Sequence, residues 1–97
     1  MRSLEELKEI INQHRQILEE EFKVKSIAIF GSFVRGEQEA KSDIDILVEF
    51  GKPISLLHIV SLENYLSDIF GIKVDVVPKK NIREELKETI LKEAISV

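Results

Sequence analysis

The sequence predicts an α/β (α+β) domain in which helices pack mainly on one face of a small mixed β-sheet. Three observations support this: the chain has 97 residues, its short β-rich segments alternate with longer segments of helical periodicity, and it contains no repeat or long linker. A chain of this length is typical of one compact unit. We therefore expect residues 1–97 to form a single domain.

The first part of the chain predicts a helix followed by a strand. Ser3 and Glu6 have the spacing of a capping box, and apolar residues then recur at helical spacing up to about Glu21. The short β-rich segment Val24–Phe30 is predicted to be a strand. Residues 32–35 are expected to form a short helical turn that stops at Gly36, and residues 37–41 form a polar loop.

The middle of the chain predicts a second strand and a long helix. Residues 43–50 alternate so that Ile44, Ile46 and Val48 face one way while the two aspartates face the other. Ser55 is expected to cap a helix that runs to about Phe70. Gly71 is a natural stop for that helix.

The last part of the chain predicts a third strand and a final helix. Residues 73–77 form the strand, which Pro78 ends. Asn81 and Glu84 have the spacing of a second capping box. The final helix is expected to carry its apolar residues on one face: Ile82, Leu86, Ile90 and Ala94.

Composition restricts the classes of function. The net charge of −4 argues against a protein whose main task is to bind nucleic acid directly. Cysteine is absent, which excludes disulfides and thiolate metal sites. No apolar run is long enough for a membrane span, and the N-terminus lacks the apolar block of a signal peptide. We therefore expect a cytoplasmic location and no membrane partner.

Three aspartates form a candidate metal site. Asp43 and Asp45 lie two residues apart on a strand, so their carboxylates leave one face about 6 to 7 Å apart. Two like charges so close are tolerable when a divalent cation lies between them, and Mg²⁺ suits carboxylate, water and phosphate oxygens. Asp75, in the middle of the third strand, is the expected third ligand.

Three acids on adjacent strands are typical of a catalytic site for phosphoryl chemistry. They would hold two Mg²⁺ ions roughly 3.5 to 4 Å apart, as in-line displacement at phosphorus requires. Asp75 would then serve as the base for the attacking hydroxyl, and the second ion would hold a nucleoside triphosphate.

A phosphate-binding turn precedes the aspartates. Ten residues separate Gly31-Ser32 from Asp43. Glycine lets backbone approach a phosphate closely, and Ser32 would add a hydroxyl at the start of a short helix. Arg35 lies one turn further on and would reach the same phosphates, although a surface salt bridge is an equally good interpretation of this arginine.

At these residues the sequence resembles the DNA polymerase β-like nucleotidyltransferase superfamily, whose signature is Gly-Ser, then Asp-x-Asp, then an acid on a later strand. Residues 31–36 and 42–48 look like the hallmark blocks of its minimal nucleotidyltransferase (MNT) group, and the resemblance covers nearly the whole chain. It implies a nucleotidyltransferase fold. It also implies an antitoxin that transfers AMP from ATP to a tyrosine hydroxyl of a HEPN ribonuclease toxin and thereby neutralises it.

Two alternatives remain open at this stage. One is an antitoxin that masks its toxin by binding without catalysis. The other is a nucleotidyltransferase that acts on a small molecule or a nucleic-acid end together with a partner subunit.

Several other polar residues have structural interpretations. His14 and His58 are expected to be surface or helix-packing residues, because they lie in predicted helices far from the acids. Tyr65 is expected at the edge of the core or in a partner contact, and Lys79-Lys80 as a solvated pair. One face of the helix from Ser55 or of the final helix is expected to be shared with a partner.

Overall fold

The structure is a computed structural model that describes residues 3–31 and 43–97. Its elements follow in the order α1 (Leu4–Gln13), α2 (Arg15–Glu20), β1 (Val24–Phe30), β2 (Ile44–Phe50), α4 (Leu56–Phe70), β3 (Val74–Pro78), the 3₁₀ helix η1 (Lys79–Asn81), α5 (Glu84–Glu93) and β4 (Ile95–Ser96). Within the described ranges, no helix is long and apolar enough to span a membrane.

The sheet has four strands in the spatial order β3-β2-β1-β4. β1 pairs antiparallel with β2 and with β4, whereas β2 pairs parallel with β3. A parallel pair needs a long crossover, and α4 supplies it. The prediction of a mixed sheet is confirmed, with β4 as an additional strand that the sequence analysis missed.

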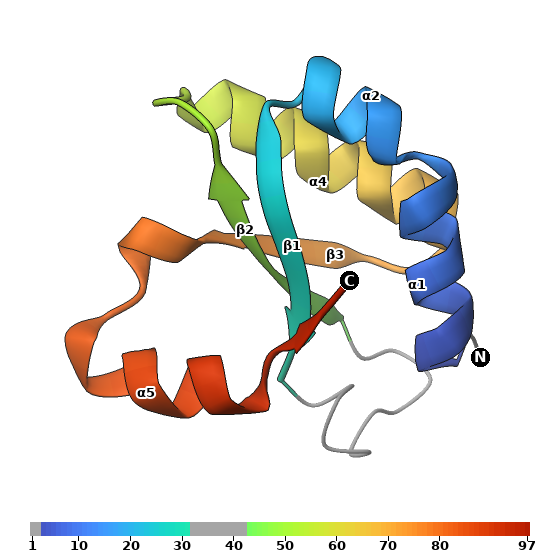
Figure 1. The fold of residues 1–97 in the computed structure, drawn as a ribbon. Helices are drawn as coiled ribbons and strands as arrows, with labels where there is room; N and C mark the ends of the chain where they lie inside the picture. The colour runs from blue at the N-terminus through green and yellow to red at the C-terminus, as the bar shows by residue number, and fades with distance from the viewer. Residues whose placement is uncertain (1–2, 32–42) are drawn as a thin grey trace.

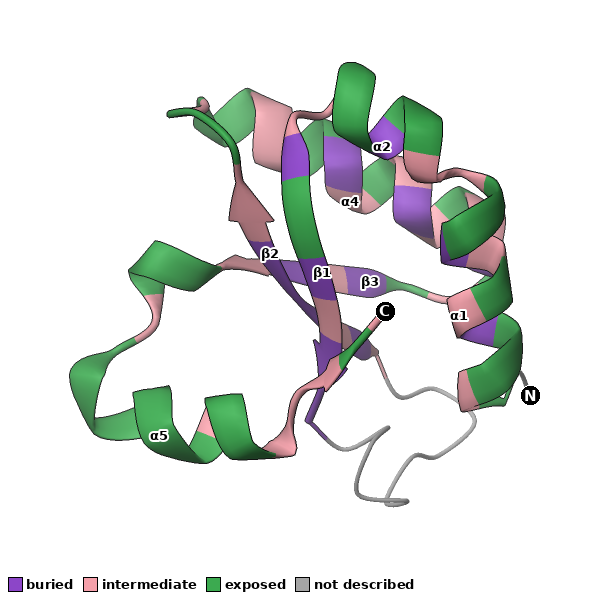
Figure 2. Cartoon of the chain, viewed as in Figure 1, coloured by how far each residue is buried: buried purple, intermediate pink, exposed green. Residues whose placement is uncertain are grey.

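Three of the helices in the described part of the chain cover one face of this sheet. Figure 1 shows α1, α2 and α4 together on one side, and α5 apart from them. The buried residues lie between those helices and the sheet, as the purple segments of Figure 2 show. They include Leu7 and Ile11 of α1, Ile46 of β2, and Leu62 and Leu66 of α4. The expected arrangement of helices mainly on one face is therefore confirmed.

The predicted helix ends are confirmed where side chains make the cap. The Ser3 hydroxyl accepts a hydrogen bond from the Glu6 amide at 3.2 Å, and Ser55 accepts from the His58 amide at 3.2 Å. Gly71 ends α4 with φ of +71°, in the left-handed region that favours glycine.

The first predicted helix is interrupted at His14, so the expectation of one helix to about Glu21 is wrong. The His14 ring donates from Nδ1 to the carbonyl of Ile10 at 2.8 Å, since a carbonyl oxygen can only accept. The backbone amide of His14 also reaches back to Ile10 and Ile11, and its ψ is 11°. A side chain that bonds into the helical ladder is a recognised cause of a kink.

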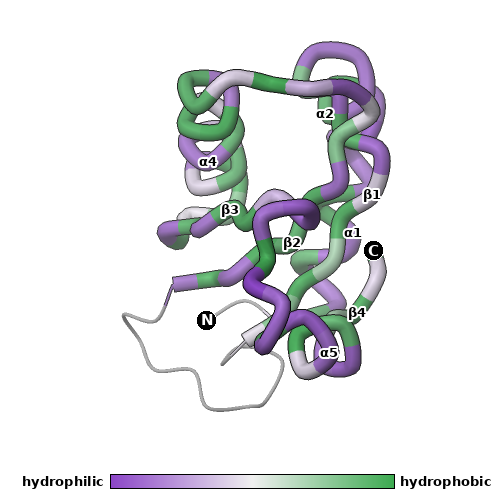
Figure 3. Tube along the Cα trace, turned by 90° about the vertical axis from the view of Figure 1, so that its left-hand side faces the viewer, coloured by the Kyte–Doolittle hydropathy of each residue, from purple (hydrophilic) through white to green (hydrophobic). Residues whose placement is uncertain are grey.

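The second predicted capping box is also wrong. Asn81 ends η1, Ile82 is extended, and α5 begins only at Glu84 with Arg83 at its N-cap and no side-chain cap bond. Ala94 is extended as well, because the chain leaves α5 there to pair with β1. The expected apolar face of this helix contains no buried residue. Figure 3 shows the contrast in hydropathy, with β2 largely hydrophobic and α5 mixed.

Candidate active site

The parallel register of β2 and β3 brings two of the three predicted aspartates together. Asp45 of β2 is the partner residue of Asp75 on β3, although thirty positions separate them in the sequence. On its other side Asp45 pairs with Phe30, the last residue of β1. Asp45 therefore lies between the end of β1 and the middle of β3, where both neighbouring strands approach it.

Asp43 meets Asp75 at the same end of the sheet. Burial raises the pKa of the Asp75 carboxyl, and a hydrogen bond with Asp43 and the negative charge of Asp43 raise it further. The ammonium of Lys73 lies 3.7 Å from Asp43 Oδ2 and acts on the pKa of Asp75 in the opposite sense. Two carboxyl groups that interact in this way are stabilised by a shared proton or by a cation.

Gly31 packs directly against Asp45. Its φ of +83° lies in the left-handed region, and a Cβ built on it would clash with Asp45 Oδ2 and lie 3.2 Å from Asp45 Cγ. Only glycine leaves room for this carboxylate while keeping this backbone conformation. The sequence predicts that Gly31 lets the backbone approach a phosphate, and this contact stays a prediction. The structure shows a second reason for the glycine, which is its close packing against Asp45.

The comparison with known families identifies the chain. The model of the nucleotidyltransferase domain matches residues 11–97, which include Gly31 and all three aspartates. The chain belongs to the nucleotidyltransferase family. It is therefore a nucleotidyltransferase, as the sequence analysis predicts.

Relatives of similar length support this assignment. The nucleotidyltransferase is 42% identical over 97 residues to protein adenylyltransferase MntA of Thermococcus cleftensis, covering 100% of this chain and 98% of that protein. It is 52% identical over 98 residues to a protein of Methanocaldococcus jannaschii, covering 100% of each.

Solved structures share the fold. A structure described as a minimal nucleotidyltransferase is 30% identical, with a TM-score of 0.75 and coverage of 94% of this chain and 95% of that one. A toxin–antitoxin crystal structure with AMP-PNP has a TM-score of 0.75 at 24% identity, over 93% of this chain and 70% of that chain. The second likeness shows the fold alone.

The donor set at this site fits a divalent cation in part. Within residues 3–31 and 43–97, no group of three or more His, Asp or Glu side chains forms a metal-binding cluster. The carboxyl groups of Asp43 and Asp75, however, interact strongly enough to raise the pKa of Asp75, and Asp45 occupies the register position beside Asp75. Carboxylate oxygens are ligands that a hard cation such as Mg²⁺ prefers. A bound cation would also offset the repulsion between these negative charges.

Two of the predicted phosphate-binding residues, Ser32 and Arg35, lie outside the described residues, as does the predicted turn of residues 32–35. Their roles stay predictions.

The remaining candidates have the structural roles that the sequence predicts. His58 donates from Nε2 to the carbonyl of Phe22 at 2.7 Å, and Tyr65 is half-buried with its ring 5.1 Å from that of Phe22.

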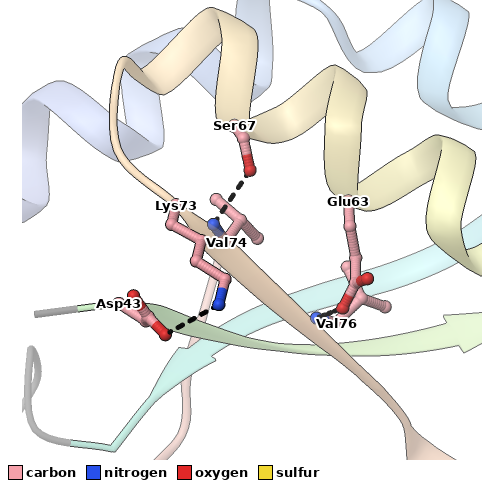
Figure 4. Close-up of polar contacts among 6 residues, drawn as sticks. All are labelled: Asp43, Glu63, Ser67, Lys73, Val74 and Val76. Carbon is pink, nitrogen blue, oxygen red and sulfur yellow. Dashed lines mark hydrogen bonds and ion pairs between the residues drawn. The ribbon is translucent and has the colours of Figure 1, made fainter.

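Two residues of α4 that the sequence analysis did not assign hold the acid-bearing strand β3 in place. β3 lies at the edge of the sheet, where backbone amides lack a strand partner. Ser67 Oγ accepts from the Val74 amide at 2.9 Å, and a Glu63 carboxylate oxygen accepts from the Val76 amide at 2.8 Å (Figure 4). These bonds flank Asp75. The only signal for them in the sequence is that Glu63 and Ser67 share a helix face, four residues apart.

Ser67→Ala is expected to lower the free energy of unfolding by about 1 to 3 kcal/mol, because the amide of Val74 loses its partner. Urea unfolding measures the change. Ser61→Ala is the matched control, since Ser61 is exposed on the same helix. Equal stability of the two variants would contradict this role for Ser67.

Asp75→Asn is expected to raise the melting temperature at about pH 7 when divalent cations are absent. Folding raises the pKa of this carboxyl, so its ionised form destabilises the fold at neutral pH. As the pH falls toward and below the unfolded value of 3.8, the carboxyl becomes protonated in both states, so the gain should shrink toward about pH 4. Melting curves at both pH values test this, with exposed Asp68→Asn as control; a gain independent of pH would contradict it.

Proposed function

We propose that this nucleotidyltransferase transfers AMP from ATP to a tyrosine hydroxyl of a HEPN-type toxin, in a reaction that depends on Mg²⁺, and neutralises the toxin. The single observation that supports this most is the convergence of Asp43 and Asp75 beside Asp45, with Gly31 packed on Asp45. The likeness to protein adenylyltransferase MntA over nearly the full length of both chains points to a protein as acceptor.

The acids have distinct tasks in this proposal. Asp43, Asp45 and Asp75 would hold Mg²⁺, which when bound supplies positive charge to the triphosphate and lowers the pKa of the acceptor hydroxyl. Gly31 has no Cβ, which leaves room for the Asp45 carboxylate in this position. Lys73, 3.7 Å from Asp43, balances part of the negative charge of the acidic cluster.

The transfer itself is a displacement at the α-phosphorus of ATP. The acceptor oxygen forms a bond to that phosphorus, the bond to pyrophosphate breaks, and the hydroxyl proton passes to Asp75. Asp75 is placed for this task by its register position beside Asp45. Gly31-Ser32 and Arg35 would bind the phosphates.

The experiment is incubation of the protein with ATP labelled at the α-phosphate, Mg²⁺ and the toxin encoded with it. The toxin should become labelled, and Asp43→Ala should leave it unlabelled. If the wild-type protein labels the toxin no more than the Asp43→Ala protein does, the enzymatic proposal is overturned. Toxin that is neutralised equally by both proteins would indicate masking by binding.

A further inference from the structure

A second charged site lies at the corner of the sheet where β3 ends. The last paired residues of β2 and β3 are Val48 and Pro78, so β2 continues beyond its neighbour to Phe50. Figure 1 shows the chain turning outward after β3 and returning as α5. A cavity of about 360 Å³ lies at this corner, which we call the corner cavity.

Four lysines line the corner cavity: Lys52 after β2, Lys79 and Lys80 of η1, and Lys87 of α5. All four are exposed, and within the described residues none of their ammonium groups makes a hydrogen bond or an ion pair. Glu49 is the one acid among the described residues that line it, and its carboxylate accepts a hydrogen bond from Ser26 at 3.3 Å. Four converging positive charges in a chain of net charge −4 indicate an anionic ligand.

The rest of the lining is apolar, which narrows the class of ligand. Val48, Phe50, Pro53 and Pro78 contribute to the wall. A volume of about 360 Å³ is that of a small-molecule site, which typically has apolar walls and a few charged groups that fix orientation. One nucleotide unit combines a flat apolar base with a phosphate that lysine binds as a point charge. An acidic surface of another protein is a poorer match, because it would pair with the lysines but would not contact the apolar wall of the cavity.

The corner cavity is close to the aspartates but separate from them. None of Asp43, Asp45 and Asp75 lines it, and Pro78 lies three residues along β3 from Asp75, about 10 Å at 3.3 Å per residue. A nucleotide held here would therefore lie beside the transfer site without occupying it.

We propose that the corner cavity is a second nucleotide-binding site, in which Lys52, Lys79, Lys80 and Lys87 hold the phosphate of one nucleotide unit against the apolar wall. The unit has two possible sources. It is either a free nucleotide or, if the proposed AMP transfer holds, an AMP already joined to the acceptor. In the second case the held AMP would keep the modified acceptor docked beside the transfer site.

Binding of labelled AMP and of labelled 5′-phosphorylated diadenylate, measured by fluorescence anisotropy, tests the site. EDTA is present, so that the metal-free aspartates repel phosphate and the signal reports the corner cavity. Lys80→Glu/Lys87→Glu should weaken binding about tenfold or more, and added salt should weaken binding to the wild type. Lys8→Glu/Lys92→Glu, which changes the charge equally outside the cavity, should stay within about twofold of the wild type.

Two results would overturn the site: no binding of either probe by the wild type, or equal loss in both double variants. Tighter binding of diadenylate than of AMP would identify the attached source, and equal binding the free source. Failure of AMP transfer would refute the proposed function and leave the binding result standing.

Discussion

Asp45→Asn is expected to lower the rate of AMP transfer by about 10³-fold or more. Asp45 lies between Phe30 and Asp75 in the sheet, where an amide would keep the shape of the side chain but remove a negative charge. In the proposed reaction Asp45 holds Mg²⁺, and loss of such a ligand removes several kcal/mol of transition-state stabilisation; each 1.36 kcal/mol is a factor of ten. Single-turnover transfer from labelled ATP to the toxin measures the effect.

The same variant separates catalysis from masking. Asp68→Asn, an exposed carboxylate on α4, makes the same chemical change away from the site and should leave the rate within about twofold. In cells that express the toxin, Asp45→Asn should no longer restore growth. Full neutralisation by a folded Asp45→Asn protein would contradict the catalytic account and favour binding alone.

Gly31→Ala is expected to abolish transfer and to lower the free energy of unfolding by about 1 to 3 kcal/mol or more. The added Cβ would clash with the Asp45 carboxylate, so Asp45, the backbone, or both must move. A displacement of a metal ligand by a fraction of an ångström is costly for catalysis because the reacting groups need close alignment.

Gly71→Ala is a control for backbone strain alone. Gly71 also has a positive φ, +71°, but a Cβ there would meet no atom within 4 Å. This variant should lose about 1 kcal/mol of stability and keep its activity. Equal activity of the two variants would contradict the argument that Gly31 is required by its contact with Asp45.

Local patterns in the sequence predict most of the fold. The errors arise where the structure of a segment depends on contacts that a local pattern does not show. Alternation in β2 and the capping serines Ser3 and Ser55 act over a few residues, so they are visible in the sequence. β4 has only two residues, Ile95–Ser96, and exists because β1 offers an unpaired edge. The break at His14 depends on a ring nitrogen that reaches the carbonyl of Ile10.

In the candidate site, too, local patterns predict some features, and contacts between distant segments determine the others. The spacing of Asp43 and Asp45 predicts that they share a face, and the order of strands makes Asp75 a plausible neighbour. The register that pairs Asp75 with Asp45, and the roles of Glu63 and Ser67 at the edge of β3, depend on how α4 crosses the sheet. Nothing in a local pattern specifies that crossing.

The most direct test of the central claim is the intact mass of the toxin after incubation with this protein, ATP and Mg²⁺, followed by location of the modified residue. The account predicts a mass increase by whole AMP units on a tyrosine, present with the wild type and absent when Asp45→Asn or EDTA is used. A toxin of unchanged mass that is nevertheless neutralised, or an AMP that appears equally with Asp45→Asn, would contradict it.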